Sequence, residues 1–298
     1  MDANQPSRSA MSAAVARGTH RLWDEPPWIF DDPFALMLVG AGWEDFAAAS
    51  RALARPFVVR QGHAGVLVRS RYPEDRLIEG EYSQYVILGA GLDSFAWRRP
   101  DLQGSLRVFE VDHPATQAWK RERVATLALL IHHDHVFVPV DFETQALNDC
   151  LDAAGFDWTR LSFFSWVGAT MYLKPDAIAA TLGIVTTCVP GSEIVLSYNQ
   201  DLQFVDEIGR EFLTAVTPQV AAMGEPVQTS FAPIEMEALV TQCGLTVVEH
   251  PTADDLFHRY CAGRTDGLRP YTLERLISAR RLIKGEMAEG TSRETSHR

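Results

Sequence analysis

The chain has 298 residues, of which 46% are hydrophobic and 22% are charged, and its formal net charge is −12. This is enough apolar material for one large domain, or two small ones, with a substantial core. The acidic balance and the scattered Lys and Arg argue against a general nucleic-acid-binding protein. No apolar run approaches the ~20 residues that a membrane span needs.

The first 18 residues contain no apolar stretch of the kind found in signal peptides. The four cysteines are widely spaced and form no Cys-x-x-Cys pair: Cys150, Cys188, Cys243 and Cys261. This pattern favours a reducing compartment and argues against a disulfide framework or a cysteine-based zinc site. A soluble, cytoplasmic α/β protein is therefore expected.

Residues 1–80 are predicted to form helices joined by polar turns. Ser9–Leu22 is rich in alanine, and Asp31-Asp32-Pro33 has the carboxylates and the early proline that are typical of a helix start. Two more helical segments are predicted at Phe57–Arg69 and Pro73–Glu79. These helices are expected to form a cap on the rest of the chain.

From residue 84 onward, short β-rich runs alternate with helical stretches. Helices are expected to begin at Pro114 and to cover Pro175–Cys188 and Glu235–Cys243. Alternation of strands and helices predicts βαβ units in a doubly wound, mostly parallel sheet. The predicted strands are Tyr85–Leu88, Leu106–Val111, Val136–Val140, Leu161–Val167, Glu193–Tyr198 and Leu245–Val248.

The first strand runs into a glycine turn, Gly89-Ala90-Gly91, followed by Asp93. Glycines at 89 and 91 permit a positive φ and let a ligand approach the backbone. A dinucleotide fingerprint would have a third glycine where this chain has Ser94, so a pyrophosphate cradle is incomplete. A strand–helix turn without any ligand is the alternative.

Three further strand ends carry a carboxylate or a glycine. Asp112 ends the second strand about 20 residues after the glycine turn, where an acid can hold ribose hydroxyls; its alternative role is the N-cap of the helix at Pro114. Asp141 and Phe142 follow the third strand and suit an adenine ring, unless Asp141 is itself an N-cap. Gly168 follows the fourth strand. Together they predict a nucleoside site along one edge of the sheet.

With these residues assembled, nearly the whole chain resembles the S-adenosylmethionine-dependent leucine carboxyl methyltransferase family. The resemblance is carried by the segments DDPFA, VRSRYPEDRLI, VILGAGLDSFAWR, FEVDHP with Lys120 downstream, VPVDF, WVGATMYL and RTDGL. It implies a class I, Rossmann-like methyltransferase fold with a seven-stranded sheet. The expected organisation is a helical cap at 1–80, a cofactor-binding core at 81–285 and a flexible tail at 286–298.

The resemblance also implies which residues hold the cofactor, S-adenosylmethionine. The glycine loop would lie beside its methionine portion, Asp112 would hold the ribose, and Asp141 with Phe142 would hold the adenine. An arginine of the VRSRY segment would bind the carboxylate, Arg69 being preferred over Arg71. The full set of implied cofactor contacts is Arg69, Arg71, Gly89, Ala90, Gly91, Asp93, Asp112, His113, Asp141, Phe142, Trp166 and Gly168.

The fourth-strand segment departs from the family in one respect. Many members have Glu before its glycine, where this chain has Val167. That substitution leaves one polar contact to the cofactor unaccounted for. The segment as it stands in this chain resembles that of the family branch that acts on polyketides and other small natural products.

Methyl transfer from a sulfonium is an in-line displacement, in which positioning and desolvation dominate. A carboxylate acceptor needs no base, whereas a phenol, with a reference pKa near 10, would use one. Four histidines are candidate bases: His20, His63, His113 and His250. The tract from His132 to His135 has no matching ligand set, and we interpret it as a solvated loop without metal.

The acceptor pocket is expected between the N-terminal helices and the segments after the fourth and fifth strands. Tyr172, Arg259 and Arg264 are the candidates for positioning the acceptor. Candidate lining aromatics are Trp23, Trp28, Phe30, Tyr172, Tyr198, Phe204 and Phe231.

The predicted function is O-methylation of a small molecule, on a carboxyl group first and a phenol second, by a protein that could form a homodimer. Two alternatives remain. One is a nicotinamide-dependent oxidoreductase, which Ser94 and the long helical cap disfavour. The other is a cofactor-binding regulator without turnover, suggested by Val167.

Overall fold

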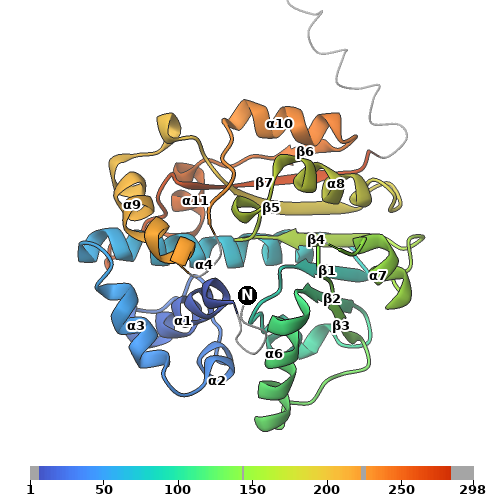
Figure 1. Ribbon diagram of the computed structural model, residues 1–298, viewed down its shortest axis with the longest axis horizontal. Coiled ribbons are helices and arrows are strands. Elements are labelled where there is room, and N and C mark those ends of the chain that lie inside the picture. The colour runs from blue at the N-terminus through green and yellow to red at the C-terminus, as the bar shows by residue number, and fades with distance from the viewer. Residues whose placement is uncertain (1–6, 143, 223–225, 283–298) are drawn as a thin grey trace, which may run out of the picture.

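The computed structural model describes residues 7–142, 144–222 and 226–282. The predicted tail at 286–298 lies outside these residues. Within them, one seven-stranded sheet runs through the middle of the molecule with helices on both faces (Figure 1). The strand order is β3-β2-β1-β4-β5-β7-β6. This arrangement confirms the predicted Rossmann-like α/β fold.

Six strands of the sheet point the same way, and β7 runs antiparallel to its neighbours β5 and β6. The first six follow the predicted runs to within one or two residues at each end. The bounds are β1 Gln84–Leu88, β2 Arg107–Asp112, β3 His135–Pro139, β4 Ser162–Trp166, β5 Glu193–Asn199, β6 Thr246–Glu249 and β7 Glu274–Arg280.

The sequence pattern did not predict β7. Its residues, ERLISAR, mix charged and small side chains with only two large apolar ones. The strand is nevertheless buried in its centre, because it pairs along its length with β5 on one side and β6 on the other. Long-range pairing, rather than local propensity, makes this segment a strand.

The first three helices form a group at the lower left of Figure 1, in blue, and the fourth runs from there across the middle of the molecule. Helix α1 contacts α2, α3 and α4, and α4 also contacts α9 from the second half of the chain. The division into a helical cap at 1–80 and a cofactor-binding core at 81–285 stays a prediction. The helices are α1 Arg8–Trp23, α2 Ala35–Val39, α3 Trp43–Arg51, α4 Pro56–Glu79, α5 Phe95–Arg98, α6 Pro114–Thr126, α7 Leu147–Ala153, α8 Pro175–Val185, α9 Glu207–Ala222, α10 Pro233–Gln242 and α11 Ala253–Tyr260, with short 3-10 turns η1 Pro100–Leu102, η2 Thr170–Tyr172 and η3 Leu202–Phe204.

Two predictions in the helical part were wrong. Phe57–Arg69 and Pro73–Glu79 are one helix, α4, which continues through Pro73. Proline removes one helical hydrogen bond, but the buried face of α4 on both sides of it holds the helix together. Helix α2 begins at Ala35, not at Asp31, because the Asp32 carboxylate accepts the amides of Phe34 and Ala35 from outside the helix.

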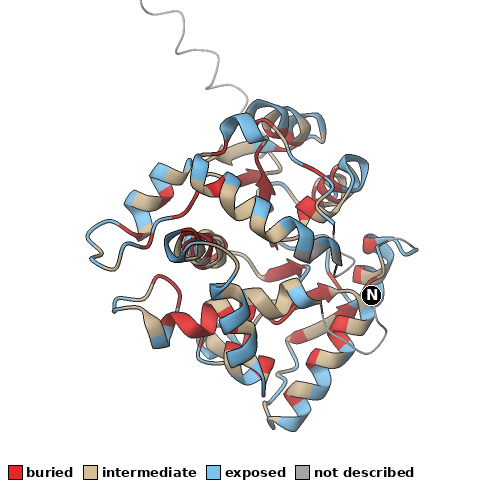
Figure 2. Cartoon of the chain, turned by 60° about the vertical axis from the view of Figure 1, so that its left-hand side comes forward, coloured by how far each residue is buried: buried red, intermediate tan, exposed pale blue. Residues whose placement is uncertain are grey.

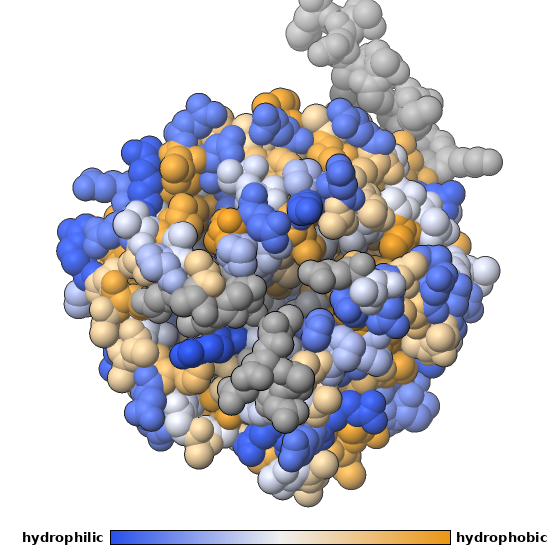
Figure 3. All heavy atoms as spheres, in the orientation of Figure 1, coloured by the Kyte–Doolittle hydropathy of each residue, from blue (hydrophilic) through white to orange (hydrophobic). Residues whose placement is uncertain are grey.

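The apolar core consists of two main clusters, one on each face of the sheet. Figure 2 shows buried residues on the strands and on the inward faces of the helices, with exposed residues facing outward. Hydrophilic and hydrophobic side chains alternate over the surface seen in Figure 3 without a large apolar patch. Within the described residues, no helix combines the length and apolar character required to cross a membrane.

Candidate active site at the carboxyl ends of the strands

The glycine turn after β1 is closely packed against the N-terminal helix. Gly91 has a φ of +53°, and a Cβ there would come within 2.8 Å of the Ala10 Cβ in α1. The turn is held by two backbone bonds, from the Ala90 amide to the Val111 carbonyl (3.0 Å) and from the Asp93 amide to the Ala90 carbonyl (2.8 Å). Only glycine satisfies both the backbone angle and the space at position 91.

Asp112 ends β2 directly beside this turn. Its carboxylate accepts the backbone N–H of Gly91 and, at 2.6 Å, that of His113. Burial raises the pKa of Asp112, although both hydrogen bonds oppose the shift. The N-cap of α6 is His113, whose Nδ1 accepts the Ala115 amide at 3.2 Å, so the alternative of Asp112 as N-cap is wrong. Two amide bonds leave lone pairs on this carboxylate for further donors.

Asp141 and Phe142 follow β3 at the same edge. The Thr144 hydroxyl donates to Asp141 Oδ2 at 2.9 Å, and the Asp141 amide donates to the Gln145 side chain at 2.9 Å. Helix α7 has Ala146 at its N-cap, so the alternative of Asp141 as N-cap is also wrong. Phe142 is 38% exposed, which leaves part of its ring for a ligand.

The segment after β4 brings Gly168 against Arg69 of α4. Gly168 has a φ of +71°, and a Cβ there would come within 2.7 Å of Arg69 Nη2. Its amide donates to the Ser197 hydroxyl of β5 at 2.8 Å. Trp166, by contrast, packs in the apolar core, which argues against the predicted cofactor contact from its side chain.

The two arginines of the VRSRY segment lie in different surroundings. Arg69 is largely buried, and its Nη1 donates to Glu274 Oε2 of β7 at 2.7 Å. Burial would lower the pKa of Arg69, but Glu274 outweighs it and raises the pKa. Arg71 is half exposed and pairs with Asp75 one helical turn away, at 2.6 Å. The structure therefore brings Arg69, and not Arg71, to the glycine of the fourth-strand segment.

A cavity of about 240 Å³ lies next to Arg69. It is bounded by α1, α3, α4 and α9, together with Tyr172 after β4 and Tyr271 before β7. This is the location that the sequence predicts for an acceptor pocket. Three arginines line it, Arg8, Arg51 and Arg69, and none of its described lining residues is acidic. In a protein with a net charge of −12, that local excess of positive charge favours an anionic ligand.

His63 also lines the cavity and is the one candidate base that does so among the described residues. Its Nε2 is 3.6 Å from Asp24 Oδ2. Burial lowers the pKa of His63 to about 4 in spite of that carboxylate. His20 Nδ1 lies 2.7 Å from Asp24, while its Nε2 accepts the Ile29 amide at 2.9 Å. The Ile29 bond places the His20 proton on Nδ1, directed at Asp24, which does not suit metal ligation by that atom.

Several predicted positioning residues lie elsewhere. Arg259 pairs with Glu249 of β6. Arg264 pairs with Asp266 and donates to the Pro27 and Glu25 carbonyls, which ties the C-terminal part to the cap. His250 bonds to Tyr198 and Glu237. Of the predicted lining aromatics, Trp23 and Tyr172 line the cavity, and the following do not: Trp28, Phe30, Tyr198, Phe204 and Phe231.

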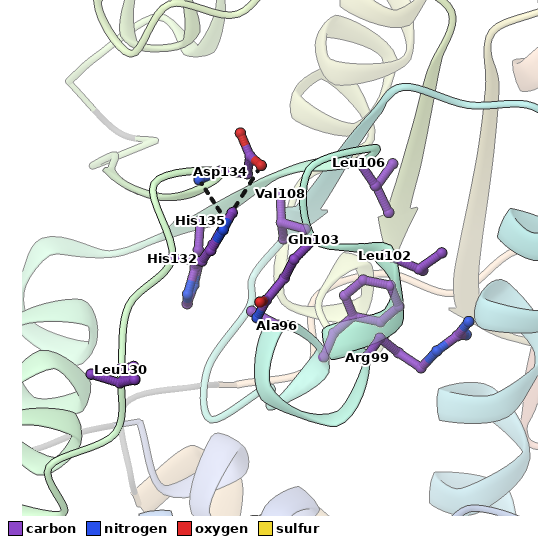
Figure 4. A pocket seen from close by; sticks show the side chains of 11 residues that line it. Ala96, Arg99, Leu102, Gln103, Leu106, Val108, Leu130, His132, Asp134 and His135 are labelled. Carbon is purple, nitrogen blue, oxygen red and sulfur yellow. Dashed lines mark hydrogen bonds and ion pairs between the residues drawn. The ribbon is translucent and has the colours of Figure 1, made fainter.

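The histidine tract lies at the amino ends of the strands, opposite to the candidate site at their carboxyl ends. His132 and Asp134 line a hollow of about 20 Å³ near the amino ends of β2 and β3, a volume suited to about one water (Figure 4). His133 is exposed, as a solvated loop requires, but His135 is buried and bonds to Glu110 at 2.9 Å. For His135 the loop interpretation was wrong, because it begins β3 and contacts a buried ion pair between Glu110 of the FEVDHP segment and Lys120 of α6.

Sequence reasoning missed four polar residues of this region. Arg8, Arg51 and Asp24 lie in helices or turns whose pattern gave no sign of a cavity. Glu274 was missed together with β7. Its Oε1 is buried and has no hydrogen-bond partner within the described part of the chain. The one available signal was the expectation, from the family resemblance, of a Glu where this chain has Val167.

Comparisons with known proteins agree with this geometry. The pattern of the leucine carboxyl methyltransferase family matches residues 10–186. A Bacillus subtilis (strain 168) protein named as a putative S-adenosyl-L-methionine-dependent methyltransferase, YktD, is 32% identical, covering 94% of this chain and 99% of its own. A protein of Mycobacterium sp. (strain JLS) with the same description, apart from the YktD designation, is 30% identical, covering 85% of this chain and 94% of its own.

Solved structures share the fold. A DUF574 family protein from Streptomyces avermitilis superposes with a TM-score of 0.61 at 16% identity, covering 93% of this chain and 98% of its own. A putative methyltransferase from Thermobifida fusca has a TM-score of 0.61 at 17% identity, covering 95% of this chain and 97% of its own. The sequence matches over most of the chain confirm the predicted family and exclude the oxidoreductase alternative: the chain belongs to the leucine carboxyl methyltransferase family.

Proposed function

We propose that this protein methylates an oxygen atom of a small organic anion, a carboxylate in the first instance. The protein is a methyltransferase of its family, and S-adenosylmethionine is its cofactor. The observation that carries the proposal for the acceptor is the cavity beside Arg69, with its arginines and without an acidic lining residue among those described. The branch that acts on polyketide-like natural products remains part of the proposal.

The residues at the edge of the sheet fit the cofactor. In the proposal, Asp112 accepts hydrogen bonds from the ribose, and Asp141 and Phe142 receive the adenine. The turn at Gly89–Gly91 leaves room beside the methionine portion, and Arg69 binds its carboxylate. Bound there, the cofactor supplies an electrophilic methyl group on a sulfonium. The protein's part is to orient the acceptor and exclude water.

A carboxylate is favoured over a phenol by the state of His63. Burial holds its pKa at about 4, roughly six below the reference value of a phenol. Proton transfer from a phenol to this histidine would therefore be strongly uphill. A carboxylate is already ionised at neutral pH and is attracted by Arg8 and Arg51, which have no carboxylate partner among the described residues.

A phenolic acceptor is the second candidate, because His63 does face the cavity and could accept a hydrogen bond from a hydroxyl. Aromatic side chains on several sides of the cavity suit a planar acceptor in either case. They are Trp23, Phe46, Tyr172, Phe212 and Tyr271.

Transfer of a labelled methyl group tests the proposal directly. The purified protein is incubated with labelled S-adenosylmethionine and matched sets of aromatic compounds: carboxylic acids, their primary amides, and phenols of the same ring system. We expect base-labile label, the mark of a methyl ester, on the acids only. Label on the phenols alone would replace the carboxylate proposal by the phenolic one. Cofactor binding without transfer to any acceptor would favour the regulator alternative. The homodimer and the cytoplasmic location stay predictions.

A further inference from the structure

Glu274 is a buried acid with unused hydrogen-bonding capacity. It begins β7 and pairs with Asn199, the last residue of β5, so it lies at the edge of the sheet where the parallel strands end. Its side chain is 6% exposed. Oε2 accepts Arg69, but Oε1 is buried and has no partner among the described residues. A buried carboxylate oxygen without a donor is rare in folded proteins and calls for an explanation.

The neighbours of Glu274 connect it to the proposed cofactor site. Arg69, its ion-pair partner, also lies beside Gly168: a Cβ at that position would come within 2.7 Å of Arg69 Nη2. Tyr172 and Tyr271 lie close enough to Arg69 to affect its pKa, and both line the cavity. Arg69 and Glu274 thus present one cation and one half-satisfied anion side by side at the carboxyl end of β4.

A fixed pair of opposite charges complements a zwitterion. The methionine portion of the cofactor carries a carboxylate and an α-ammonium on one carbon atom, and an ammonium offers three donors. Charge-assisted bonds to an arginine and a carboxylate are the strong contacts for such groups. The residue between β4 and Gly168 is Val167, so this position supplies no carboxylate for the ammonium.

We propose that Glu274 Oε1 accepts a hydrogen bond from the α-ammonium of the cofactor while Arg69 binds its carboxylate. In this arrangement the carboxylate for the ammonium comes from β7, because Val167 after β4 offers none. The inference rests on the proposed placement of the cofactor, and in particular on Arg69 as the carboxylate ligand. Glu274 would be a binding residue, distinct from a residue that only orients Arg69.

Calorimetric binding separates these two roles without any methyl transfer. The ligands are S-adenosylhomocysteine, its analogue with hydrogen in place of the ammonium, and its analogue with hydrogen in place of the carboxylate. The proteins are the wild type and Glu274→Gln, with Glu249→Gln as the matched control. Glu249 also pairs with an arginine, Arg259, but lies outside the site.

We expect the wild type to bind S-adenosylhomocysteine about 10- to 100-fold more tightly than the analogue without the ammonium, as the loss of a charge-assisted bond implies. In Glu274→Gln this preference should fall to about threefold or less, while the preference over the analogue without the carboxylate persists. Glu249→Gln should keep both preferences. Glu274→Asp, which retains the charge, should retain most of the ammonium preference and serves if Glu274→Gln does not fold.

Two results would overturn the inference. One is a wild type that binds S-adenosylhomocysteine and its analogue without the ammonium equally. The other is an equal loss of affinity for both in Glu274→Gln, with the carboxylate preference also gone, which is the signature of a residue that only orients Arg69. Failure of the proposed function looks different, because methyl transfer to the carboxylic acids would then be absent while these binding preferences persist. A wild type that binds none of the three ligands would contradict the placement of the cofactor itself.

Discussion

Two buried ionic clusters of this protein differ in how completely their acids are bonded. In the first, Asp32 accepts Arg17 at 2.9 Å, the Ser94 hydroxyl at 2.6 Å and two backbone amides. Arg98 of the same cluster makes a two-pronged pair with Glu74. In the second cluster, Arg69 bonds to one oxygen of Glu274 and leaves the other without a described partner.

This difference distinguishes a buried acid that stabilises the fold from one that is available to a ligand. Burial would raise the pKa of Asp32, but Arg17, Arg98 and the Ser94 hydroxyl outweigh it and hold the pKa low. The hydrogen bonds of such an acid are all made within the protein. They connect the cap helices to the segment after the glycine turn. An acid with one oxygen left over is expected to be less stabilising and to acquire its partner from a ligand.

The largest expected effect is on the first cluster. Asp32→Ala removes the partner of Arg17 and of two amides at once, and it should lower the free energy of unfolding by about 3–5 kcal/mol. Urea unfolding at neutral pH measures this. Asp101→Ala, which breaks the exposed pair with Arg99, is the control and should change stability by less than about 1 kcal/mol. An equal loss of unfolding free energy in the two variants would mean that the buried bonds of Asp32 stabilise the fold no more than an exposed ion pair does.

The second cluster should respond in the opposite direction. Replacing both charges by apolar groups, in the double variant Arg69→Met with Glu274→Leu, removes an ion pair that is incompletely bonded. We expect stability that is unchanged or higher by about 1–4 kcal/mol, together with loss of cofactor binding. Thermal unfolding and calorimetry on the same preparation measure both. A double variant that unfolds more easily than the wild type would mean that this pair is structural after all.

His63 gives a third contrast, visible in the pH dependence of stability. Its pKa is about 4 in the folded protein, against an ordinary 6.5, so the unfolded chain binds the proton first as pH falls. Stability is therefore complete near pH 7 and decreases on acidification. His63 should account for a loss of about 2 kcal/mol between pH 7.5 and 5.0. The groups that act on it are Asp24, His20, Arg60 and Arg51.

The measurement for His63 is the loss of stability between pH 7.5 and 5.0, compared between wild type and His63→Gln. The comparison is needed because other acids and histidines titrate in both proteins. Unfolding curves at the two pH values should show a smaller acid-induced loss in His63→Gln. Parallel losses in the two proteins would contradict the assignment of a buried, neutral His63.

The smallest expected effect concerns the mouth of the cavity. The Arg51 guanidinium lies over the Trp23 ring at 3.5 Å and is exposed, so it should contribute about 1 kcal/mol to the binding of an anionic acceptor. Arg51→Gln should raise the acceptor KM about fivefold, less so at high salt, with cofactor affinity unchanged. Arg21→Gln is the matched control, because Arg21 also lies over a tryptophan, Trp28, but outside the cavity. A similar KM in wild type and Arg51→Gln would remove this arginine from the acceptor site.

The sequence predicted those parts of the molecule in which local pattern and structure coincide. The strands β1 to β6 are apolar runs, and the residues that end β1 to β4 lie at one edge because parallel strands end together. What it could not predict depends on partners distant in the chain. Glu274 belongs to a strand made by pairing with β5 and β6, and Arg51 reaches the cavity only when α3 packs on α4.

The sequence also could not predict the role of each residue within a specific motif. The segment LGAGLDSFAWR contains both Gly91, at the candidate site, and Arg98, which is bound to Glu74 in the core of the cap contact. Arg69 and Arg71 are two residues apart on one helix, and they differ in burial and in their ion-pair partners, Glu274 and Asp75. A motif shows that its residues matter together, whereas the hydrogen-bond partners show what each one does.

The central claim is that the edge of the sheet beside Asp112 holds the cofactor. Titration calorimetry of S-adenosylhomocysteine into wild type and Asp112→Ala tests it most directly, with Asp101→Ala as the control. The loss of charge-assisted bonds of about 1.5–3 kcal/mol each should weaken binding by tenfold or more in Asp112→Ala alone. Wild-type affinity in that variant, with its fold intact, would contradict the account.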